Sequence, residues 1–487
     1  MGLLQNRASA SARDEMKPLS VQEIRQAVGG RLLTSQPTGL PVLCVCSDTR
    51  QMERSSLFIA IKGDNHDGHQ HLPAAAAGGA VAALVSDIPD NAPPNITLIQ
   101  VADTRAAMGK LATYVRQQMS SKVIGVAGSN GKTSTKHLIH AALSGKFNGS
   151  ISPKSFNNDI GVPLTIFPAD PNQDYLVLEM GTNHHGEIMK LTTMAEPDIA
   201  VITNVGAEHL EFLGDLMGVR RENATVVAGL NPKGLLVVNG DDAELLDAVS
   251  TYPGKRVTFG FKETNDLWPA DIQCSEQGIR YRLNGSRQEV FVPMLGRHTA
   301  CNSLAAIAVA RRMGVSDKLI YESLAEATGP EWRLQLQHVG KICVLNDAYN
   351  ANPNSMRAAL ETVRDLQVKG RRLAILGDMK ELGEAADRYH REIGAFAATC
   401  KFDSLYCVGP KSALIADAAE AAGMDKRKVV HFTSAADCAQ IAPRWLRRGD
   451  MVLLKASRGV RLETVAAAIV EAFGGETKHA ATRKIAS

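Results

Sequence analysis

The sequence lacks the features that mark secreted and membrane-spanning proteins. No run of about 18 apolar residues occurs, so we expect no membrane-spanning helix and no membrane insertion. The first 16 residues are polar, are rich in Ala and Ser, and contain no apolar segment of about 7–15 residues. We therefore expect a short flexible leader at 1–16, no secretory signal, and a cytoplasmic protein.

Paired cysteines and basic clusters are also missing. The eight cysteines are scattered, and the closest pair, Cys44 and Cys46, would point to opposite faces of a strand, which argues against a disulfide framework or a zinc site. Lys and Arg number 54 against 51 Asp and Glu, and no stretch combines basic residues with interleaved aromatics. This balance excludes a nucleic-acid partner and indicates small-molecule partners.

What the sequence does contain is enough apolar material for several cores. With 487 residues, of which 45% are hydrophobic, about three domains of roughly 100–200 residues are expected. We place them at 17–120, 121–330 and 331–487. The first alternates short apolar runs with helical patterns, as in Leu57–Ile61 followed by the alanine-rich Leu72–Ala80, and is expected to be a small α/β domain.

The second domain opens with a strand, Val123–Ala127, a glycine-rich turn and a helix from about Lys132 to Leu143. Apolar runs at Tyr175–Met180, Ile199–Thr203 and Leu235–Asn239 are typical of parallel strands covered on both faces. The alternating stretch Gly278–Pro293 contains Asn284-Gly285 and predicts a hairpin at the edge of this sheet.

The third domain repeats strand and helix, which predicts a Rossmann-like, doubly wound α/β sheet. The expected strands are Lys341–Asp347, Arg371–Asp378, Ser404–Gly409 and Met451–Ser457, and two of the helices are Ser355–Leu366 and Leu462–Phe473. The fold class is thus α/β in all three domains.

A phosphate-binding loop is predicted between the first strand and helix of the second domain. It has the sequence Gly128-Ser129-Asn130-Gly131-Lys132-Thr133-Ser134. Glycines let the backbone aim N–H groups at a phosphate, Lys132 can neutralise its oxygens, and the Thr133 hydroxyl can bind Mg²⁺. The usual longer loop needs Gly at Val126, so this is a shorter G-x-x-G-K-T variant, and a chance glycine-rich turn is the alternative.

Two further side chains follow predicted strands and suit a metal site. Glu179 ends the strand Tyr175–Met180, at the carboxyl edge where open α/β sheets bind ligands. His209 lies in TNVGAEHL after the next strand, where a neutral imidazole can bind a second metal ion. A structural histidine is an equally good interpretation of His209.

The motifs GSNGKTS, LEMGTNHHGEI, TNVGAEHLEFLG, GRHTACN, NDAYNANPNSM and LGDMKELGE occur in this order and together resemble the Mur ligases. The resemblance runs from about Ser47 to Glu463. It implies a UDP-sugar-binding domain, a central P-loop-type ATP-binding parallel sheet and a C-terminal Rossmann-like domain, with ATP and Mg²⁺ as cofactors.

The resemblance also implies roles for individual residues. In the first domain, SDTR and LFIAIKGDNHDGH suggest UDP-sugar contacts at Ser47, Arg50 and His69, although an ordinary polar loop is the alternative. The residues implied for ATP are Lys132, Thr133, Asn302 (adenine), Arg333 (phosphate) and Asp347 (ribose). Those implied for Mg²⁺ are Thr133, Glu179 and His209. Those implied for the substrate are Asn157, Asn158, Tyr349, Asn350 and Asn352.

The form YNANP within Asn346–Met356 is typical of the branch that adds a dipeptide. The resemblance thus implies ATP-dependent ligation of D-Ala-D-Ala to UDP-N-acetylmuramoyl-tripeptide through an acyl phosphate, with Lys132, Glu179 and His209 as catalytic residues. We expect a monomer. Tyr349, Asn350 and Asn352 have an alternative as an Asn-Pro turn that caps the next helix. A sister ligase using another amine, or a nucleotide-binding homologue without turnover, are the rival interpretations.

One position departs from the family pattern. The family has a carbamylated lysine fourteen residues after the metal histidine, and that position is Asn223 here. An amide cannot carry a carbamate, so either Glu222 supplies a carboxylate, or the second metal ion relies on His209 and substrate oxygens, or catalysis is weakened. We hypothesise that the enzyme works without carbamylation.

Overall fold

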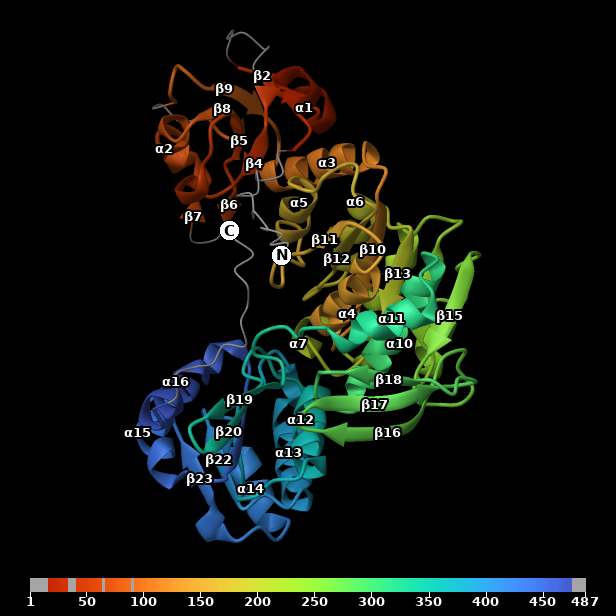
Figure 1. The fold of residues 1–487 in the computed structure, drawn as a ribbon. Coiled ribbons are helices and arrows are strands. Elements are labelled where there is room, and N and C mark those ends of the chain that lie inside the picture. The colour runs from red at the N-terminus through yellow and green to blue at the C-terminus, as the bar shows by residue number, and fades with distance from the viewer. Residues whose placement is uncertain (1–15, 34–40, 64–65, 89–91, 475–487) are drawn as a thin grey trace, which may run out of the picture.

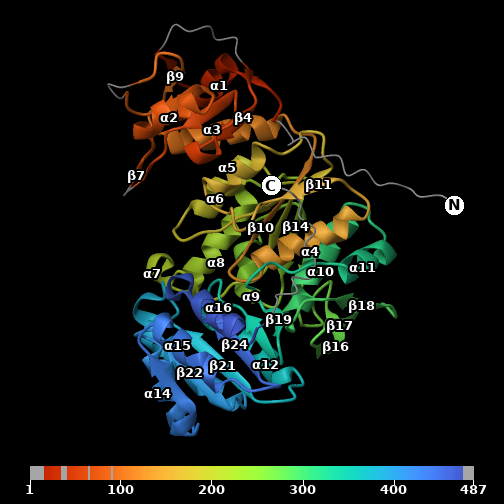
Figure 2. The same ribbon diagram turned by 60° about the vertical axis from the view of Figure 1, so that its left-hand side comes forward.

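The structure, a computed structural model, describes residues 16–33, 41–63, 66–88 and 92–474 of the chain. Apart from Met16, the expected leader at 1–16 lies outside the described residues. Three sheet-based units follow one another along the molecule, with the first at one end and the last at the other (Figure 1, Figure 2). Within the described residues, no helix is long and apolar enough to cross a membrane. The predicted α/β class is confirmed.

The first unit is built on a five-stranded sheet of order β2-β9-β8-β5-β4, in which β2 runs antiparallel to β9 and the other pairs are parallel. Its strands are β2 (Arg31–Leu32), β4 (Cys44–Cys46), β5 (Ser56–Ile59), β8 (Ala80–Val85) and β9 (Thr97–Gln100). Two short pairs accompany it, β1 (Leu19–Ser20) with β3 (Pro41–Val42) and β6 (Lys62–Gly63) with β7 (His66–Asp67). The helices are α1 (Val21–Val28), η1 (Thr49–Gln51), η2 (Gly68–His71), α2 (Leu72–Ala77) and α3 (Thr104–Gln117).

The central unit contains the predicted parallel sheet, with six strands in the order β11-β12-β10-β13-β14-β15. The strands are β10 (Lys122–Ala127), β11 (Gly149–Ile151), β12 (Tyr175–Glu179), β13 (Ile199–Ile202), β14 (Leu235–Asn239) and β15 (Lys255–Phe259). The helices are α4 (Lys132–Ser144), α5 (Gly161–Ile166), α6 (Glu187–Ala195), α7 (Leu210–Leu213), α8 (Leu216–Ala224), η3 (Thr225–Ala228), α9 (Ala243–Ala248), α10 (His298–Arg312) and α11 (Asp317–Ala325).

Successive side chains of the inner strands point to opposite faces of the sheet, and both faces are covered, so these strands have continuous apolar sequences. Leu176 and Leu178 of β12 pack with α3, α5 and α6 on one face, whereas Tyr175 and Val177 pack with α4, α10 and α11 on the other. Both faces of the sheet are therefore buried, and the polar side chains lie at the ends of the strands.

The strand order brings the predicted site residues to one edge. β10 lies between β12 and β13, with Val126 paired to Glu179 and Ala127 paired to Ile202. The loop that follows β10, the acid that ends β12 and the segment that follows β13 therefore emerge side by side at the carboxyl edge.

The predicted hairpin is present, and it belongs to a sheet of its own that follows the edge strand β15. β17 (Gly278–Leu283) and β18 (Glu289–Val292) are antiparallel and flank Asn284-Gly285, where Gly285 has a φ of +75°. Together with β16 (Pro269–Ser275) they form a separate three-stranded sheet. Its apolar face packs on α10 and α11 through residues such as Ile279 and Val292, which is why it does not extend the parallel sheet.

The third unit has a six-stranded sheet of order β19-β20-β24-β21-β22-β23. Five strands are parallel, of which four were predicted. We did not predict the parallel strand β23 or the edge strand β19, which pairs antiparallel with β20. The strands are β19 (Gln335–Val339), β20 (Ile342–Asn346), β21 (Arg372–Gly377), β22 (Ser404–Val408), β23 (Val429–Phe432) and β24 (Met451–Lys455). The helices are α12 (Pro353–Asp365), η4 (Gly383–Ala385), α13 (Ala386–Thr399), α14 (Ala413–Ala421), η5 (Lys426–Lys428), α15 (Ala435–Trp445), η6 (Arg458–Val460) and α16 (Glu463–Ala472).

Apolar contacts join the units. One hydrophobic cluster runs from the first unit through α3, whose Met108 and Leu111 are fully buried, into the face of the central sheet covered by α5 and α6. A second cluster contains Leu210 and Leu213 of α7 together with Leu382 beside η4, so the third unit packs on α7.

Candidate functional site

A cavity of about 1150 Å³ lies between the central and third units, at the carboxyl edge of the central sheet. Of the residues predicted for the site, the cavity is lined by Ser129, Asn130, Gly131, Lys132, Ser134, Asn157, Asn158, Glu179, His209, Asn302, Arg333, Asp347, Tyr349, Asn350 and Asn352. Residues up to 223 positions apart in the chain thus surround one volume, which matches the size of small-molecule sites.

The phosphate loop is held in shape by the segment that follows β13. The Ser129 N–H donates to the carbonyl of Asn204 (2.8 Å), and the Thr203 hydroxyl donates to the carbonyl of Asn130 (2.6 Å). Gly128 has a φ of +123°, and a Cβ there would lie 2.9 Å from the backbone nitrogen of Thr203, so both conformation and space require glycine. The loop then leads into the N-terminus of α4, a position that favours anions.

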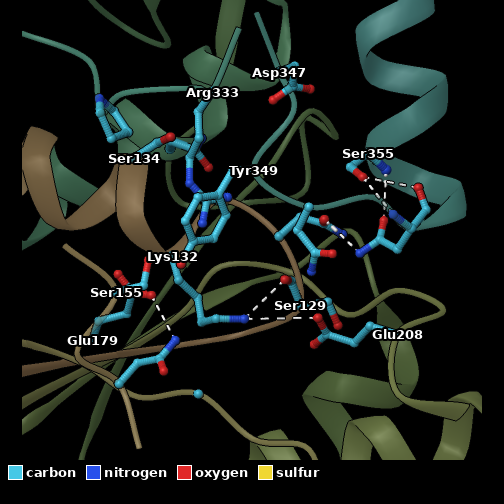
Figure 3. A pocket seen from close by; sticks show the side chains of 18 of the residues that line it. Ser129, Lys132, Ser134, Ser155, Glu179, Glu208, Arg333, Asp347, Tyr349 and Ser355 are labelled. Atoms are coloured by element: carbon cyan, nitrogen blue, oxygen red, sulfur yellow. Dashed lines mark hydrogen bonds and ion pairs between the residues drawn. The ribbon is translucent and has the colours of Figure 1, made fainter. Parts of the chain in front are cut away.

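Lys132 begins α4 and places its ammonium group at the centre of the loop. Its Nζ donates to the carbonyl oxygens of Gly128 (2.5 Å) and Ser129 (3.1 Å). Figure 3 shows this side chain directed towards Ser129 and Glu208, with Tyr349 and Arg333 close by. A phosphate bound at the loop would meet this cation directly.

Glu179 forms a buried ion pair that sequence reasoning did not find. Its Oε2 lies 3.2 Å from Nζ of Lys136, and both side chains are almost fully buried. Burial alone raises the pKa of Glu179, but Lys136, Arg333 and Lys132 outweigh it and hold the pKa below its usual value. Lys136 stands four residues after Lys132, on the same helix face, and that spacing was the available signal.

His209 pairs with a carboxylate of the third unit, that of Glu381. Its Nδ1 lies 2.5 Å from Oε2 of Glu381, and its Nε2 lies 4.0 Å from Oε2 of Glu208. Both His209 (φ +50°) and Glu381 (φ +62°) adopt the left-handed conformation. Neither Glu208 nor Glu381 was predicted, although both lie inside quoted motifs.

The residues contributed by the third unit are tied together. The guanidinium of Arg333 lies over the ring of Tyr349, 4.4 Å from its centroid. Asp347 accepts from Nζ of the buried Lys455 (2.6 Å) and from the backbone of Leu334 (3.2 Å). Asp347 is therefore a fixed carboxylate at the cavity wall.

Asparagines link the two units and their loops. Asn352 caps α12 by a reciprocal pair of hydrogen bonds with Ser355, as the alternative interpretation expects, and its Nδ2 also donates to Oδ1 of Asn130 in the phosphate loop (2.8 Å). Asn157 donates to Oε1 of Glu179 (3.0 Å), whereas the oxygen of Asn158 accepts from the start of α5.

Asn302 of α10 completes the loop's surroundings. A Cβ at Gly131, which has a φ of +82°, would lie 2.6 Å from Oδ1 of Asn302. The close approach shows that α10 packs against the phosphate loop, and it explains why residue 131 is glycine.

Ser47, Arg50 and His69 do not line this cavity. The exposed Arg50 pairs with Asp48 at 2.8 Å. His69 is buried, with Nδ1 bonded to Asp67 (2.6 Å) and Nε2 accepting from the Ser86 N–H (3.0 Å). Both ring nitrogens are used inside the protein, which favours the alternative of a structural loop histidine.

Glu222 does not supply a carboxylate to the cavity. It accepts from the N–H groups of Gly186 (2.7 Å) and Ile188 (2.8 Å) at the start of α6, so its oxygens already cap a helix. The buried Asn223 donates to the carbonyl of Val219 (3.0 Å) and does not line the cavity. The first of the three alternatives for this departure is therefore wrong.

The donor atoms suit Mg²⁺ shared with a phosphate. Among the described residues, the buried oxygens Thr133 Oγ1 and Glu208 Oε1 have no hydrogen-bond partner. No group of three or more His, Cys, Asp or Glu in the described part of the chain can hold a metal ion alone. This is the pattern of a magnesium site that uses one or two protein ligands and completes its shell with phosphate oxygens and water.

Comparison with known families agrees with these features. The chain matches the Mur ligase family catalytic domain at residues 42–116, the Mur ligase middle domain at 126–310, and the Mur ligase glutamate ligase domain at 332–458. Two similar proteins are each named UDP-N-acetylmuramoyl-tripeptide–D-alanyl-D-alanine ligase. The Bacillus subtilis protein is 36% identical, over 93% of this chain and 98% of its own. The Escherichia coli protein is 34% identical, over 83% and 88%.

Solved structures give the same result. A crystal structure of MurF from Acinetobacter baumannii superposes with a TM-score of 0.86 at 29% identity, over 94% of this chain and 99% of the other. The MurF ligase from Thermotoga maritima in complex with ADP has a TM-score of 0.78 at 26% identity, over 88% and 97%. The predicted resemblance is confirmed, and the chain belongs to the Mur ligase family.

Proposed function

We propose that this protein uses ATP to join D-Ala-D-Ala to UDP-N-acetylmuramoyl-tripeptide, giving the pentapeptide precursor of peptidoglycan. The observation that carries the proposal is the cavity between the central and third units. The phosphate loop, the buried Glu179, His209 and the YNANP segment all line it. The relatives of that name, aligned over nearly their full lengths, support the choice of substrates.

The residues of the cavity suit the first half of this reaction, phosphoryl transfer from ATP to the tripeptide carboxylate. Both reactants are anionic and repel each other, so the main task is to gather negative charge. Lys132 and the N-terminus of α4 would hold the phosphates, and Arg333 would face them from the third unit. Asp347 would accept the ribose hydroxyls because its position is fixed by Lys455.

Mg²⁺ belongs to this proposal. Thr133, Glu179 and His209 are the side chains that we expect to hold it, and it would neutralise charge on the transferred phosphoryl group. Thr133 and His209 have an oxygen and a nitrogen available, whereas Glu179 is engaged by Lys136 and Asn157, so Glu179 would have to exchange one of these contacts to reach an ion.

The second half of the reaction is attack of the dipeptide amine on the acyl phosphate, with release of inorganic phosphate. Closure of the third unit over the cavity would exclude water, which otherwise hydrolyses the acyl phosphate. Asn157, Asn158, Tyr349 and Asn350 line the cavity and are proposed to contact the peptide portions.

The remaining expectations are part of the same proposal. UDP-sugar recognition is assigned to the first unit, at 17–120, with ATP binding at 121–330 and the closing unit at 331–487. Ser47 and Arg50 remain candidates for the UDP moiety because Ser47 is partly exposed and Arg50, in η1, is exposed. A monomer in the cytoplasm stays our prediction.

The test is ATP-dependent phosphate release with UDP-muramoyl tripeptide and a panel of amines. We expect release with D-Ala-D-Ala and formation of the pentapeptide. Release that requires D-Ala, meso-diaminopimelate, L-lysine or L-glutamate instead would assign the protein to a sister ligase. Nucleotide binding without release with any amine would favour a homologue that has lost turnover.

We also propose that turnover needs no carbamylated lysine, because the position that would carry it is the buried amide Asn223. Added bicarbonate should leave the rate of phosphate release unchanged. A strong stimulation by bicarbonate, traced to a modified lysine near the cavity, would contradict this.

A further inference from the structure

One buried carboxylate in the cavity, that of Glu208, is poorly paired by its neighbours. Glu208 is 7% exposed and lines the cavity wall. Among the described residues its Oε1 has no hydrogen-bond partner, and its Oε2 lies 4.0 Å from both Nζ of Lys132 and Nε2 of His209. Figure 3 shows its carboxylate facing the ammonium group of Lys132.

Electrostatics makes this placement costly unless a cation is bound nearby. A buried carboxylate normally accepts hydrogen bonds or pairs closely with a cation, because either offsets its loss of hydration. Lys132 does not do so at 4.0 Å, since its ammonium group is bonded to the carbonyls of Gly128 and Ser129. A phosphate at the loop would add a second negative charge beside Glu208, so the two anions need a cation between them.

Two groups near the cavity could bind that cation, the carboxylate of Glu208 and one ring nitrogen of His209, because the other candidates already have partners. Glu222 is used at the start of α6, and Nδ1 of His209 is used by Glu381. The remaining nitrogen, Nε2, faces Glu208. Two ligands that each lie about 2.1 Å from one ion are at most about 4.2 Å apart, so the 4.0 Å between Oε2 and Nε2 is compatible with a shared ion.

We propose that Glu208 supplies the carboxylate ligand of the metal ion held by His209, in a chain where the carbamylated position is an amide. The inference rests on the proposed function, because the phosphate oxygens of the nucleotide complete the shell. It adds a residue to the site: Glu208 binds a divalent, oxygen-preferring cation together with Nε2 of His209.

The experiment is a Mn²⁺ titration of the full chain, followed by electron paramagnetic resonance in the presence of saturating ADP. The variant is Glu208→Gln, which keeps the shape of the side chain and removes the charge. The matched control is Glu211→Gln, the same change at an exposed position three residues later. We expect Glu208→Gln to weaken one Mn²⁺ site about tenfold or more and the control to match the wild type.

Two further readouts separate a ligand from a structural residue. With EDTA present, the ADP affinity of Glu208→Gln should stay within about twofold of the wild type, and its unfolding temperature should be unchanged or higher, because a poorly paired buried charge has been removed. A clear fall in unfolding temperature, or unchanged Mn²⁺ affinity, would overturn the assignment.

The outcome is distinguishable from failure of the proposed function. The Mn²⁺ titration needs no amine or tripeptide. Loss of the Mn²⁺ site in a protein that ligates no amine would support Glu208 while the substrate proposal fails. Full ligase activity with equal Mn²⁺ binding in wild type and Glu208→Gln would leave the function in place and reject Glu208 as a ligand.

Discussion

At the scale of single residues, Lys132 is the side chain whose loss should separate activity from stability. Its ammonium group contacts only carbonyl oxygens of its own loop at hydrogen-bonding distance, within the described residues. Those oxygens face the cavity and can be hydrated when the lysine is removed. The fold therefore depends little on this cation, whereas phosphate binding depends on it directly.

We expect Lys132→Ala to lower ATP-dependent phosphate release by about 100-fold or more, with the free energy of unfolding changed by no more than about 1 kcal/mol. Phosphate release and chemical denaturation measure the two quantities. Lys146→Ala, at an exposed position just after α4, is the control and should keep full activity. A loss of stability as large as the loss of activity would show that Lys132 is mainly structural.

At the scale of elements, α4 carries a pH-sensitive contribution to stability. Burial, together with the nearby Lys136 and His140, lowers the pKa of His137 from 6.5 to about 4. The unfolded chain therefore takes up a proton near pH 6.5 while the folded chain resists it until about pH 4. The stability that the folded protein gains by keeping His137 neutral is fully present above pH 6.5, and it is lost as the pH falls towards 4.

His137→Gln should therefore flatten the decline in unfolding free energy between pH 6.5 and pH 4. Urea denaturation at several pH values gives the slope, and His338→Gln at an exposed position on β19 is the control. A variant with the wild-type slope over this range would show that His137 is protonated in the folded protein.

The contact between α7 and the turn before η4 is the second element with a functional consequence. Glu381 reaches His209 from the third unit, and its backbone carbonyl accepts from the N–H of Glu211 (3.3 Å). Glu381 fixes which imidazole nitrogen is left for a metal ion. We regard it as a positioning residue that acts only when the third unit is docked.

We expect Glu381→Ala to lower kcat about tenfold or more, to weaken Mn²⁺ binding in parallel, and to leave the KM for ATP nearly unchanged. Glu381→Gln, which can still accept from the imidazole, should recover part of both losses. Glu384→Ala, at an exposed position three residues later in η4, is the control. Loss of kcat with unchanged Mn²⁺ binding would point to a role in docking alone.

At the scale of the whole molecule, the cavity exists only because two units meet. Asn352 of the third unit bonds to Asn130 of the phosphate loop, so nucleotide binding should order both. We predict that ADP with Mg²⁺ slows amide hydrogen exchange at 128–134 and at 346–354, and leaves β8 of the first unit unchanged. Protection confined to 128–134 would mean that ADP binds without engaging the third unit.

Much of this architecture could be predicted from local sequence, and the exceptions have physical causes. The strand β10, the loop and α4 were predictable because the apolar run, the glycines and the helical pattern are contiguous. The edge strand β19 was not, since its residues are half-exposed and polar, and its pairing with β20 is decided by the third unit's sheet. Lys136 and Glu381 were missed because their partners are distant in sequence.

The hydrophobic cluster that runs through α3 has a consequence for protein engineering. Because α3 buries residues such as Met108 and Leu111 in a cluster shared by the first two units, a cut near residue 120 would expose apolar surface on both fragments. A chimera that takes its first unit from a sister enzyme would need to import α3 together with the faces of α5 and α6 on which α3 packs. The third unit shares a second cluster with Leu210 and Leu213 of α7, so neither terminal unit can be exchanged without the residues against which it packs.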